Sequence, residues 1–468
     1  MIVGSVVVAA MTAFYIAAVV NPLAHLSGLP VAVVNQDAGA TVGGHRLQVG
    51  AQVQAGLLAA PAVTGRLRLE PLTLAQAEQA MDRDELYATL AIPPGFTGDL
   101  LTGAGLRPTR AVVSPRVTIL INQRAGTVGT SLATGVLQPA LAVASGQIGR
   151  ELAPLVPAAA QAPATRLFVT DPVTVTIAQY RPLPDNAALA LSAFYVALLT
   201  ILSGFVGAGI VNAVVDSALG YATTELGPRW SQRQPVPINR WQTLLIKWSL
   251  IAVLTGVLTA VMLLLAWGVG LDLPYPWVLW PFTWLCAASV GIGTIALLAM
   301  IGNYGQLLAL LVFIYSGLAS AGGTVPLEAL PPFLRQLSYI DPLRQILSGT
   351  RSILYFNAQG VAGLTRGTVA ASAGLVFWLV VGAVVVRWYD GKGLYRLQPE
   401  VLAHVGQAIA DYHAKQAAAG APEQPAPAPQ SDAARPDAAR PDAARPDAAR
   451  PDAGEAGGNG DHPAAGGG

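Results

Sequence analysis

The chain carries little charge for its length. Only 11% of its 468 residues are Asp, Glu, Lys or Arg, whereas a soluble domain is about 25% charged. The shortage is concentrated in several stretches of about 20 apolar residues, which as helices are long enough to cross about 30 Å of hydrocarbon. The net charge is +1, so no overall field favours nucleic acid as a partner. These properties indicate an integral membrane protein that contacts the lipid bilayer.

Cysteine and histidine are also scarce. The one cysteine, Cys286, lies inside an apolar stretch and has no second cysteine to pair with, so it does not reveal the redox compartment. None of the five histidines is spaced from another histidine or from the cysteine as metal ligands are. The sequence therefore predicts neither a metal site nor a cofactor.

Motifs for nucleotide hydrolysis and for common hydrolases are missing from the sequence. There is no Walker A motif, so this chain cannot hydrolyse ATP through a P-loop. There is no Gly-x-Ser-x-Gly and no His-Glu-x-x-His. The segment Gly291–Ala296 matches the dinucleotide pattern, but it lies within an uncharged apolar run and follows no soluble strand. We expect that the protein is not an enzyme.

Six apolar segments are predicted to be transmembrane helices. They cover 2–20, 187–215, 244–271, two spans divided at 302–306 within the uncharged run 273–327, and 368–386. The first is read as a retained helix, because no basic residue precedes it as in a signal peptide. Lys247, at the entrance of the third span, is expected to snorkel toward the membrane surface.

Small residues recur within the predicted spans. Gly204 and Gly207 belong to overlapping small-xxx-small patterns in the second span, and Gly317 belongs to another in the fifth. Such patterns let helix backbones approach closely. We expect these glycines, and Gly291 and Gly293 in the fourth span, to pack helices together within the bundle or in a dimer.

The region between the first two spans, residues 21–186, has the composition of a soluble domain. It is large enough to bury its own core. Apolar runs bounded by turn formers predict strands, and longer apolar stretches predict helices. The predicted strands are 30–34, 86–92, 116–121 and 173–177, and the predicted helices are 73–84 and 127–152. This alternation predicts an α+β or α/β domain inserted between the first and second spans.

The positions of Lys and Arg near the span ends predict the orientation. Arg229, Arg233 and Arg240 follow the second span, and Arg387 and Lys392 follow the sixth. Six spans place both groups on one side, which is therefore cytoplasmic. In this topology both termini are cytoplasmic and the 21–186 domain is extracytoplasmic. We expect the membrane to be the cell's plasma membrane.

Two further segments have distinct patterns. Leucine and isoleucine recur at helical spacing from Leu327 to Ile340 in an outer loop that also carries arginines, which predicts an amphipathic helix on the membrane surface. Residues 187–395 would form a five-helix membrane domain, and 396–468 a disordered cytoplasmic tail. The tail repeats Asp-Ala-Ala-Arg-Pro from Asp432 to Pro451 and has almost no large apolar residue to build a core.

Polar residues near the membrane are the candidate site residues. A proton-driven transporter usually carries ionisable residues within its spans, and the cores of the six spans have none, which disfavours a proton-coupled pump. Asp216, at the inner edge of the second span, and Glu225, in the loop beyond, are candidates for coupling to a partner or to protons; Asp216 also suits a membrane boundary. Asn212 and Asn303 are candidates to line a path, or to hydrogen-bond between helices.

Several segments resemble known families. Leu29–Ala40, directly after the first span, looks like the opening of phage-infection-protein (YhgE/Pip) and nitrosoguanidine-resistance type membrane proteins, and Tyr87–Phe96 is similar to their second external segment. Ser316-Gly317, Gly322–Pro331 and Asp341–Arg351 look like the late segment of the type-2 ABC export permeases. In that superfamily this segment is an outer re-entrant helical stretch before the last span. The resemblance covers about residues 1–395 and excludes the tail.

The resemblance implies a six-span permease fold that usually works as a homodimer. It implies a separate ATP-binding subunit as partner, contacted through the cytoplasmic loop at about 216–240. The leading hypothesis is therefore an exporter of small hydrophobic or amphipathic compounds, or of an envelope component. The alternative is a non-transporting membrane scaffold or receptor, secretion-associated or phage-receptor-like, that acts through its outer domain.

Overall fold

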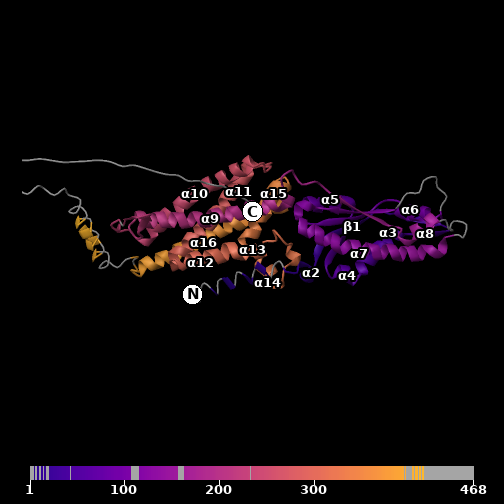
Figure 1. The fold of residues 1–468 in the computed structure, drawn as a ribbon, viewed down its shortest axis with the longest axis horizontal. Helices are drawn as coiled ribbons and strands as arrows, with labels where there is room; N and C mark the ends of the chain where they lie inside the picture. The colour runs from indigo at the N-terminus through magenta and orange to yellow at the C-terminus, as the bar shows by residue number, and fades with distance from the viewer. Residues whose placement is uncertain are drawn as a thin grey trace, which may run out of the picture. The chain divides into compact units, whose positions relative to one another are not determined.

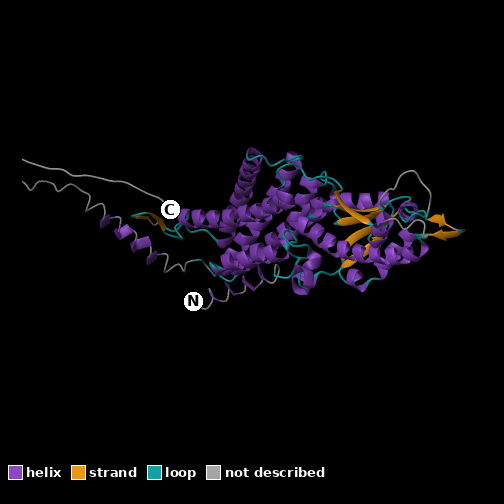
Figure 2. Cartoon of the chain, turned by 45° about the vertical axis from the view of Figure 1, so that its right-hand side comes forward, coloured by secondary structure: helices purple, strands orange, loops and turns teal. Residues whose placement is uncertain are grey.

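We describe a computed structural model of the chain. It describes residues 20–42, 44–106, 115–156, 163–231 and 233–394, with scattered positions before 20 and between 396 and 415. More than half of the expected first span, 2–20, and most of the tail, including all of its repeats, therefore lie outside the described residues. The described part is mostly helical, with a sheet-containing N-terminal region followed by a bundle of long helices (Figure 1 and Figure 2).

The sheet region alternates short strands with helices. Its strands are β1 (Leu29–Asn35), β2 (Ala40–Val42), β3 (His45–Leu47), β4 (Leu67–Pro71), β5 (Ala88–Ile92), β6 (Arg116–Ile121) and β7 (Thr174–Gln179). Its helices are α2 (Pro22–His25), α3 (Val49–Ala59), α4 (Pro61–Thr64), α5 (Leu74–Asp82), α6 (Phe96–Gly103), α7 (Thr127–Leu152) and α8 (Pro163–Thr170), with short 3₁₀ turns at Gln123–Ala125 (η1) and Ala153–Leu155 (η2).

A five-stranded mixed sheet in the order β4-β1-β5-β6-β7 organises this region. Strand β1 pairs in parallel with β4 and β5, whereas β5 pairs antiparallel with β6, which is parallel to β7. Alternate side chains of a strand point to opposite faces. Val31 and Val33 enter the core formed with α3, α6 and α7, while Ala32 and Val34 face α5 on the other side. Helices therefore cover both faces of the sheet.

The four predicted strands and two predicted helices are all present. The limits of β6 and α7 agree with the predicted 116–121 and 127–152, and α5 begins after Thr73, which caps it in a capping box with Gln76. The edge strand β4 was not predicted. It is five residues long and alternates charged with apolar residues, so its local pattern is weak.

The bundle region contains the longest helices. They are α9 (Leu191–Ala218), α10 (Arg240–Gly268), α11 (Pro276–Ile301) and α16 (Thr365–Gly391). Shorter elements join them: η4 (Ala188–Ala190), β8 (Thr224–Leu226), β9 (Arg229–Ser231), α12 (Tyr304–Ala309), the π-helical η5 (Leu310–Tyr315), α13 (Ser316–Ser320), η6 (Leu327–Ala329), α14 (Pro332–Leu337), α15 (Pro342–Tyr355) and the π-helical η7 (Gly360–Leu364).

Five helical runs among the described residues are long and apolar enough to cross a membrane. Four contain the long bundle helices just named. The fifth, Thr127–Leu155, contains α7, whose Leu132, Val136 and Leu137 pack in the core of the sheet region. The expected fifth span appears as a shorter apolar run, Tyr304–Ser320, which follows a turn at Gly302 and includes the π-helical η5. The count of six spans stays a prediction.

The prediction of an amphipathic helix on the membrane surface from Leu327 to Ile340 is wrong. Residues 327–340 form the short η6 and α14, separated at Pro331, and not one helix. Leu330 and Leu334, each 2% exposed, pack in the main hydrophobic core of the sheet region instead of lying on a membrane surface. Proline at 331 and 332 prevents a continuous helix, and tertiary burial explains the apolar spacing.

The small residues of the long helices pack them together within the chain, as expected. Gly204 on α9 and Gly291 on α11 face each other: a Cβ added to Gly204 would lie 2.3 Å from the Ala287 carbonyl oxygen. A Cβ on Gly293 would lie 2.8 Å from the rings of Phe313 and Trp378. Only glycine permits these approaches of backbone to backbone and to ring.

Candidate functional site

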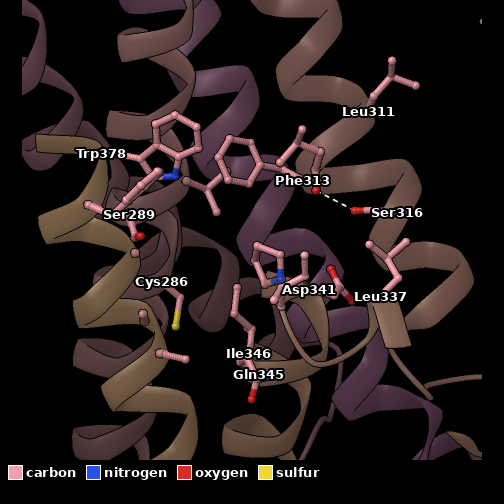
Figure 3. Close-up of a pocket in the computed structure, with 18 of the residues that line it drawn as sticks. Cys286, Ser289, Leu311, Phe313, Ser316, Leu337, Asp341, Gln345, Ile346 and Trp378 are labelled. Atoms are coloured by element: carbon pink, nitrogen blue, oxygen red, sulfur yellow. Dashed lines mark hydrogen bonds between the residues drawn. The ribbon is translucent and has the colours of Figure 1, made fainter. Parts of the chain in front are cut away.

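A mainly apolar cavity of about 510 Å³ lies among the helices of the bundle region (Figure 3). This volume is typical of sites for small organic ligands. Its walls come from α11, η5, α13, α14, α15 and α16, so segments distant in sequence enclose it. The lining side chains include Cys286, Ser289, Phe313, Ser316, Phe333, Asp341, Gln345, Ala370, Phe377 and Trp378.

Aromatic side chains form one wall of the cavity. Phe313 and Trp378 meet edge to face with ring centroids 5.8 Å apart, and Phe377 contacts Trp378 at 5.0 Å. Figure 3 shows the rings of Phe313 and Trp378 together, with Asp341 and Gln345 on the side away from them. Phe333 also lines the cavity and is 62% exposed, so the cavity is open beside α14.

The polar wall is built at the start of α15. Asp341, 2% exposed, is the N-cap of this helix, and its carboxylate accepts hydrogen bonds from the backbone amides of Leu343 and Arg344, both at 3.2 Å. Gln345 donates through Nε2 to the carbonyl of Tyr339, but its buried Oε1 has no partner among the described residues. An unpartnered buried acceptor is rare in folded proteins.

The structure brings two of the predicted site residues together in a second, polar cluster. Lys247 donates through Nζ to Asn212 Oδ1 at 2.6 Å and to Asp216 Oδ1 at 2.7 Å. Arg396 donates to both carboxylate oxygens of Asp216, at 2.6 and 2.9 Å. Lys247 is only 6% exposed, so the prediction that it snorkels outward is wrong: it is paired within the bundle. Asn212 here bonds between helices α9 and α10.

This polar cluster borders a cavity of about 300 Å³ that Arg240 and Arg396 also line. At its edge the carboxylate of Asp390, on α16, accepts hydrogen bonds from the backbone amides of Arg240 and Trp241, at 3.2 and 3.0 Å. Asp390 thereby satisfies two amides at the N-terminus of α10. The cluster and this cap join α9, α10, α16 and Arg396, which follows α16 in the chain.

The other two predicted site residues lie elsewhere. Asn303 is exposed in the turn between α11 and α12, so it does not line either cavity. Glu225 lies on β8 and pairs with Trp230 of β9 in a hairpin between α9 and α10. That hairpin was not predicted from the sequence. The described residues hold no group of three or more metal-ligating side chains.

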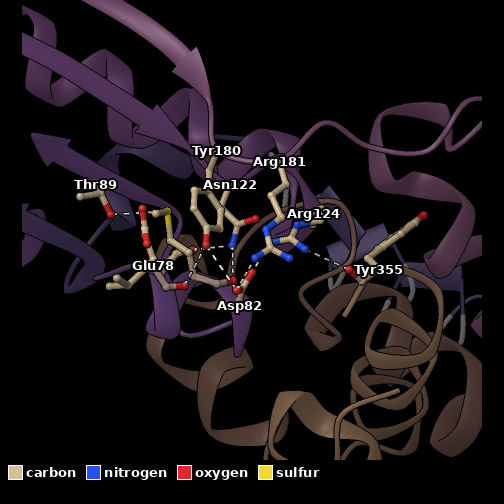
Figure 4. Close-up of polar contacts among 10 residues, drawn as sticks. Glu78, Asp82, Thr89, Asn122, Arg124, Tyr180, Arg181 and Tyr355 are labelled. Carbon is tan, nitrogen blue, oxygen red and sulfur yellow. Dashed lines mark hydrogen bonds and ion pairs between the residues drawn. The ribbon is translucent and has the colours of Figure 1, made fainter. Parts of the chain in front are cut away.

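A third polar group links the sheet region to the bundle region (Figure 4). Arg124, which follows β6, pairs with Asp82 at 3.0 Å and donates to the carbonyl of Tyr355 at 3.2 Å. The Tyr355 hydroxyl is 2.5 Å from Ser192 Oγ and accepts from the Ala193 amide. A continuous chain of contacts therefore runs from the sheet through α15 to the start of α9.

Stability is expected to fall with rising pH because of Asp84, a half-buried residue beside this junction. Burial raises the pKa of Asp84 from 3.8 to about 6, against the attraction of Arg351 and Arg124. The folded state therefore binds the proton more tightly, and its stability falls as pH rises from about 4 to about 6, by at most about 3 kcal/mol. Asp84→Asn should remove this dependence and stabilise the protein at pH 7.5, since Asn tolerates the positive φ of 62°.

Unfolding titrations in detergent between pH 4 and pH 7.5 would measure this effect. Glu85→Gln, at the exposed neighbouring residue, is the control. If Asp84→Asn leaves the pH profile of the parent unchanged, Asp84 is not the titrating group.

Sequence reasoning missed the polar residues of the apolar cavity. Asp341 and Gln345 were noted only within a resembling segment, because their burial depends on the packing of α11, η5 and α16 around α15. The pair Asp341-Pro342 was the available local signal, since an acidic N-cap followed by proline starts a helix.

Comparisons with known proteins give a family but no function. No curated protein gives a significant match to the chain. A crystal structure of a domain of a protein provisionally described as an ABC type-2 transporter, from Thermotoga maritima MSB8, is similar over 32% of this chain and 85% of that chain, with 18% sequence identity and a TM-score of 0.23. A family model described as "Protein of unknown function (DUF3533)" matches residues 1–380. The chain therefore belongs to this family, DUF3533.

Proposed function

We propose that this protein is a permease-like exporter that moves small hydrophobic or amphipathic compounds, or an envelope component, across the plasma membrane. The observation that carries the proposal is the mainly apolar cavity of about 510 Å³ among the bundle helices. A cavity with aromatic walls and a few polar groups suits a small organic molecule. It lies beside η5, and π-helical segments are frequent at functional sites.

The resemblance to type-2 ABC export permeases supports the remaining parts of the proposal. The chain has no Walker A motif, so the energy would come from a separate ATP-binding subunit, and the chain itself would not be an enzyme. The hairpin β8–β9 between α9 and α10 is the part of the expected contact loop that has regular structure. We also propose a homodimer, with both termini in the cytoplasm and the sheet region outside.

Purification of the tagged full-length protein in mild detergent tests this proposal. We expect mass spectrometry to find an ATP-binding protein in stoichiometric amount, and the eluate to hydrolyse ATP. Glu225→Lys in the β8–β9 hairpin should reduce both the partner and the ATPase activity. His45→Ala, at an exposed residue of the β2–β3 hairpin in the sheet region, is the control and should change neither.

The opposite result would favour the scaffold or receptor hypothesis. Recovery of envelope or secretion proteins without any ATPase, lost on changes in the sheet region, would contradict the exporter proposal. An ATPase that remains bound to the Glu225→Lys variant would place the contact outside the hairpin.

A further inference from the structure

The apolar cavity has an unusual distribution of charge. Of the described residues that line it, Asp341 is the only one with a charged side chain. Its carboxylate forms no salt bridge with a described Lys, Arg or His, although the side chain is almost fully buried. Buried charges in proteins are normally paired. Hydrogen bonds from two backbone amides stabilise the carboxylate but leave its net charge in place.

The second polar group of the wall also lacks a partner. Gln345 is 7% exposed, and its Oε1 is a buried acceptor without a donor among the described residues. Asp341 caps the start of α15, and Gln345 lies in the first turns of the same helix. Both residues line the cavity, so its polar wall consists mainly of hydrogen-bond acceptors.

The opposite wall suits a cation as well. Phe313, Phe377 and Trp378 provide ring faces and edges within the same cavity. Aromatic rings attract cations through the negative potential of their faces, and more strongly when the cation is desolvated. They also bury the apolar part of a ligand. None of the described residues that line the cavity is cationic, so an anion bound there would face the carboxylate.

We propose that the cavity binds amphipathic ammonium compounds, with the ammonium group donating to Asp341 and the apolar part packed among Phe313, Phe377 and Trp378. The proposal rests on the exporter function and specifies its substrate class. It does not require the ATP-binding subunit, so it can be tested on the purified chain alone.

Three naphthalene derivatives of similar shape test the preference for charge: naphthylmethylammonium, naphthylmethanol and naphthylacetate. Their binding is measured by equilibrium dialysis at pH 7.5 against the full-length protein in phosphatidylcholine nanodiscs, with empty nanodiscs subtracted. We expect the ammonium compound to bind at least about tenfold more tightly than the alcohol, because both can donate to Asp341 but only the ammonium group compensates its buried charge. The carboxylate compound should bind most weakly.

Asp341→Asn removes the charge of this side chain and keeps nearly the same shape. Asn also caps helices well, so α15 should be retained. The variant should bind the ammonium compound and naphthylmethanol with similar Kd values. Ala370→Phe fills the cavity and should weaken binding of both compounds, whereas Ala373→Phe, at an exposed position on the same helix, should weaken neither.

The outcomes distinguish the substrate class from the function. Equal binding of the three compounds, or an unchanged preference in Asp341→Asn, would overturn the ammonium proposal and leave the apolar cavity as a binding site. Binding that Ala370→Phe does not weaken would place the ligand elsewhere. That result, or binding of none of the three compounds, would count against both this inference and the exporter proposal.

Discussion

Asp216→Ala should lower the free energy of unfolding by about 3–5 kcal/mol, because it leaves a buried ammonium without its counter-ion. In the folded protein Lys247 is paired with Asp216, and its only other described acceptor is Asn212 Oδ1. The same change also releases Arg396 from its bidentate bond. Unfolding by SDS titration in mixed micelles, followed by circular dichroism, would measure the loss.

A double variant identifies the cause of this loss. Replacing both partners by apolar residues of similar size often costs little, so Asp216→Leu with Lys247→Met should recover most of the stability. Lys392→Ala, at an exposed residue beyond α16, should change stability by less than about 0.5 kcal/mol. A double variant as unstable as Asp216→Ala would mean that the unpaired Lys247 is not the source of the loss.

Gly204→Ala should destabilise the bundle by about 2–3 kcal/mol through overpacking between α9 and α11. The added Cβ would lie 2.3 Å from the Ala287 carbonyl oxygen and 3.1 Å from the Gly291 amide nitrogen. Both atoms belong to backbone, so no side-chain rotation relieves the contact and the helices must move apart. The same SDS titration measures the effect.

Gly209→Ala on the same helix is the matched control. Its Cβ would meet the end of the Gln306 side chain at 3.6 Å, which is ordinary contact. Alanine is a better helix former than glycine by about 1 kcal/mol, so this variant should be neutral or slightly stabilised. If both variants behave alike, the approach of α9 to α11 is less close than described.

Features with a local cause could be predicted from the sequence. Strand β6 and helix α7 were found within their observed limits, because an apolar run between turn formers and a long apolar helical stretch are signals within one segment. The close packing at Gly204 and Gly291 followed from the small size of these residues. Strand β4, with only five residues and alternating charge, gave too weak a signal.

Features that depend on distant residues could not be predicted. The partner of Lys247 is Asp216, 31 residues earlier, so the sequence near a span end did not distinguish a paired lysine from a snorkelling one. The apolar spacing from Leu327 to Ile340 is real, but what buries Leu330 and Leu334 is the sheet region, far earlier in the chain. The acceptors Asp341 and Gln345 likewise become a site only when α11, η5, α13, α14 and α16 enclose them.

The core of the sheet region has a consequence for how the protein is made. Ala319, Val325, Ala329, Leu330 and Leu334 complete this core, and the backbone amide of Ser27 donates to the carbonyl of Glu328. Ribosomes add residues at about 5–20 per second, so the roughly 155 residues from the end of β7 to Leu334 keep the early domain unfinished for about 8–30 seconds. During that interval the apolar surface that these residues later cover is exposed. A chaperone that binds this surface until α14 has been synthesised would favour correct folding.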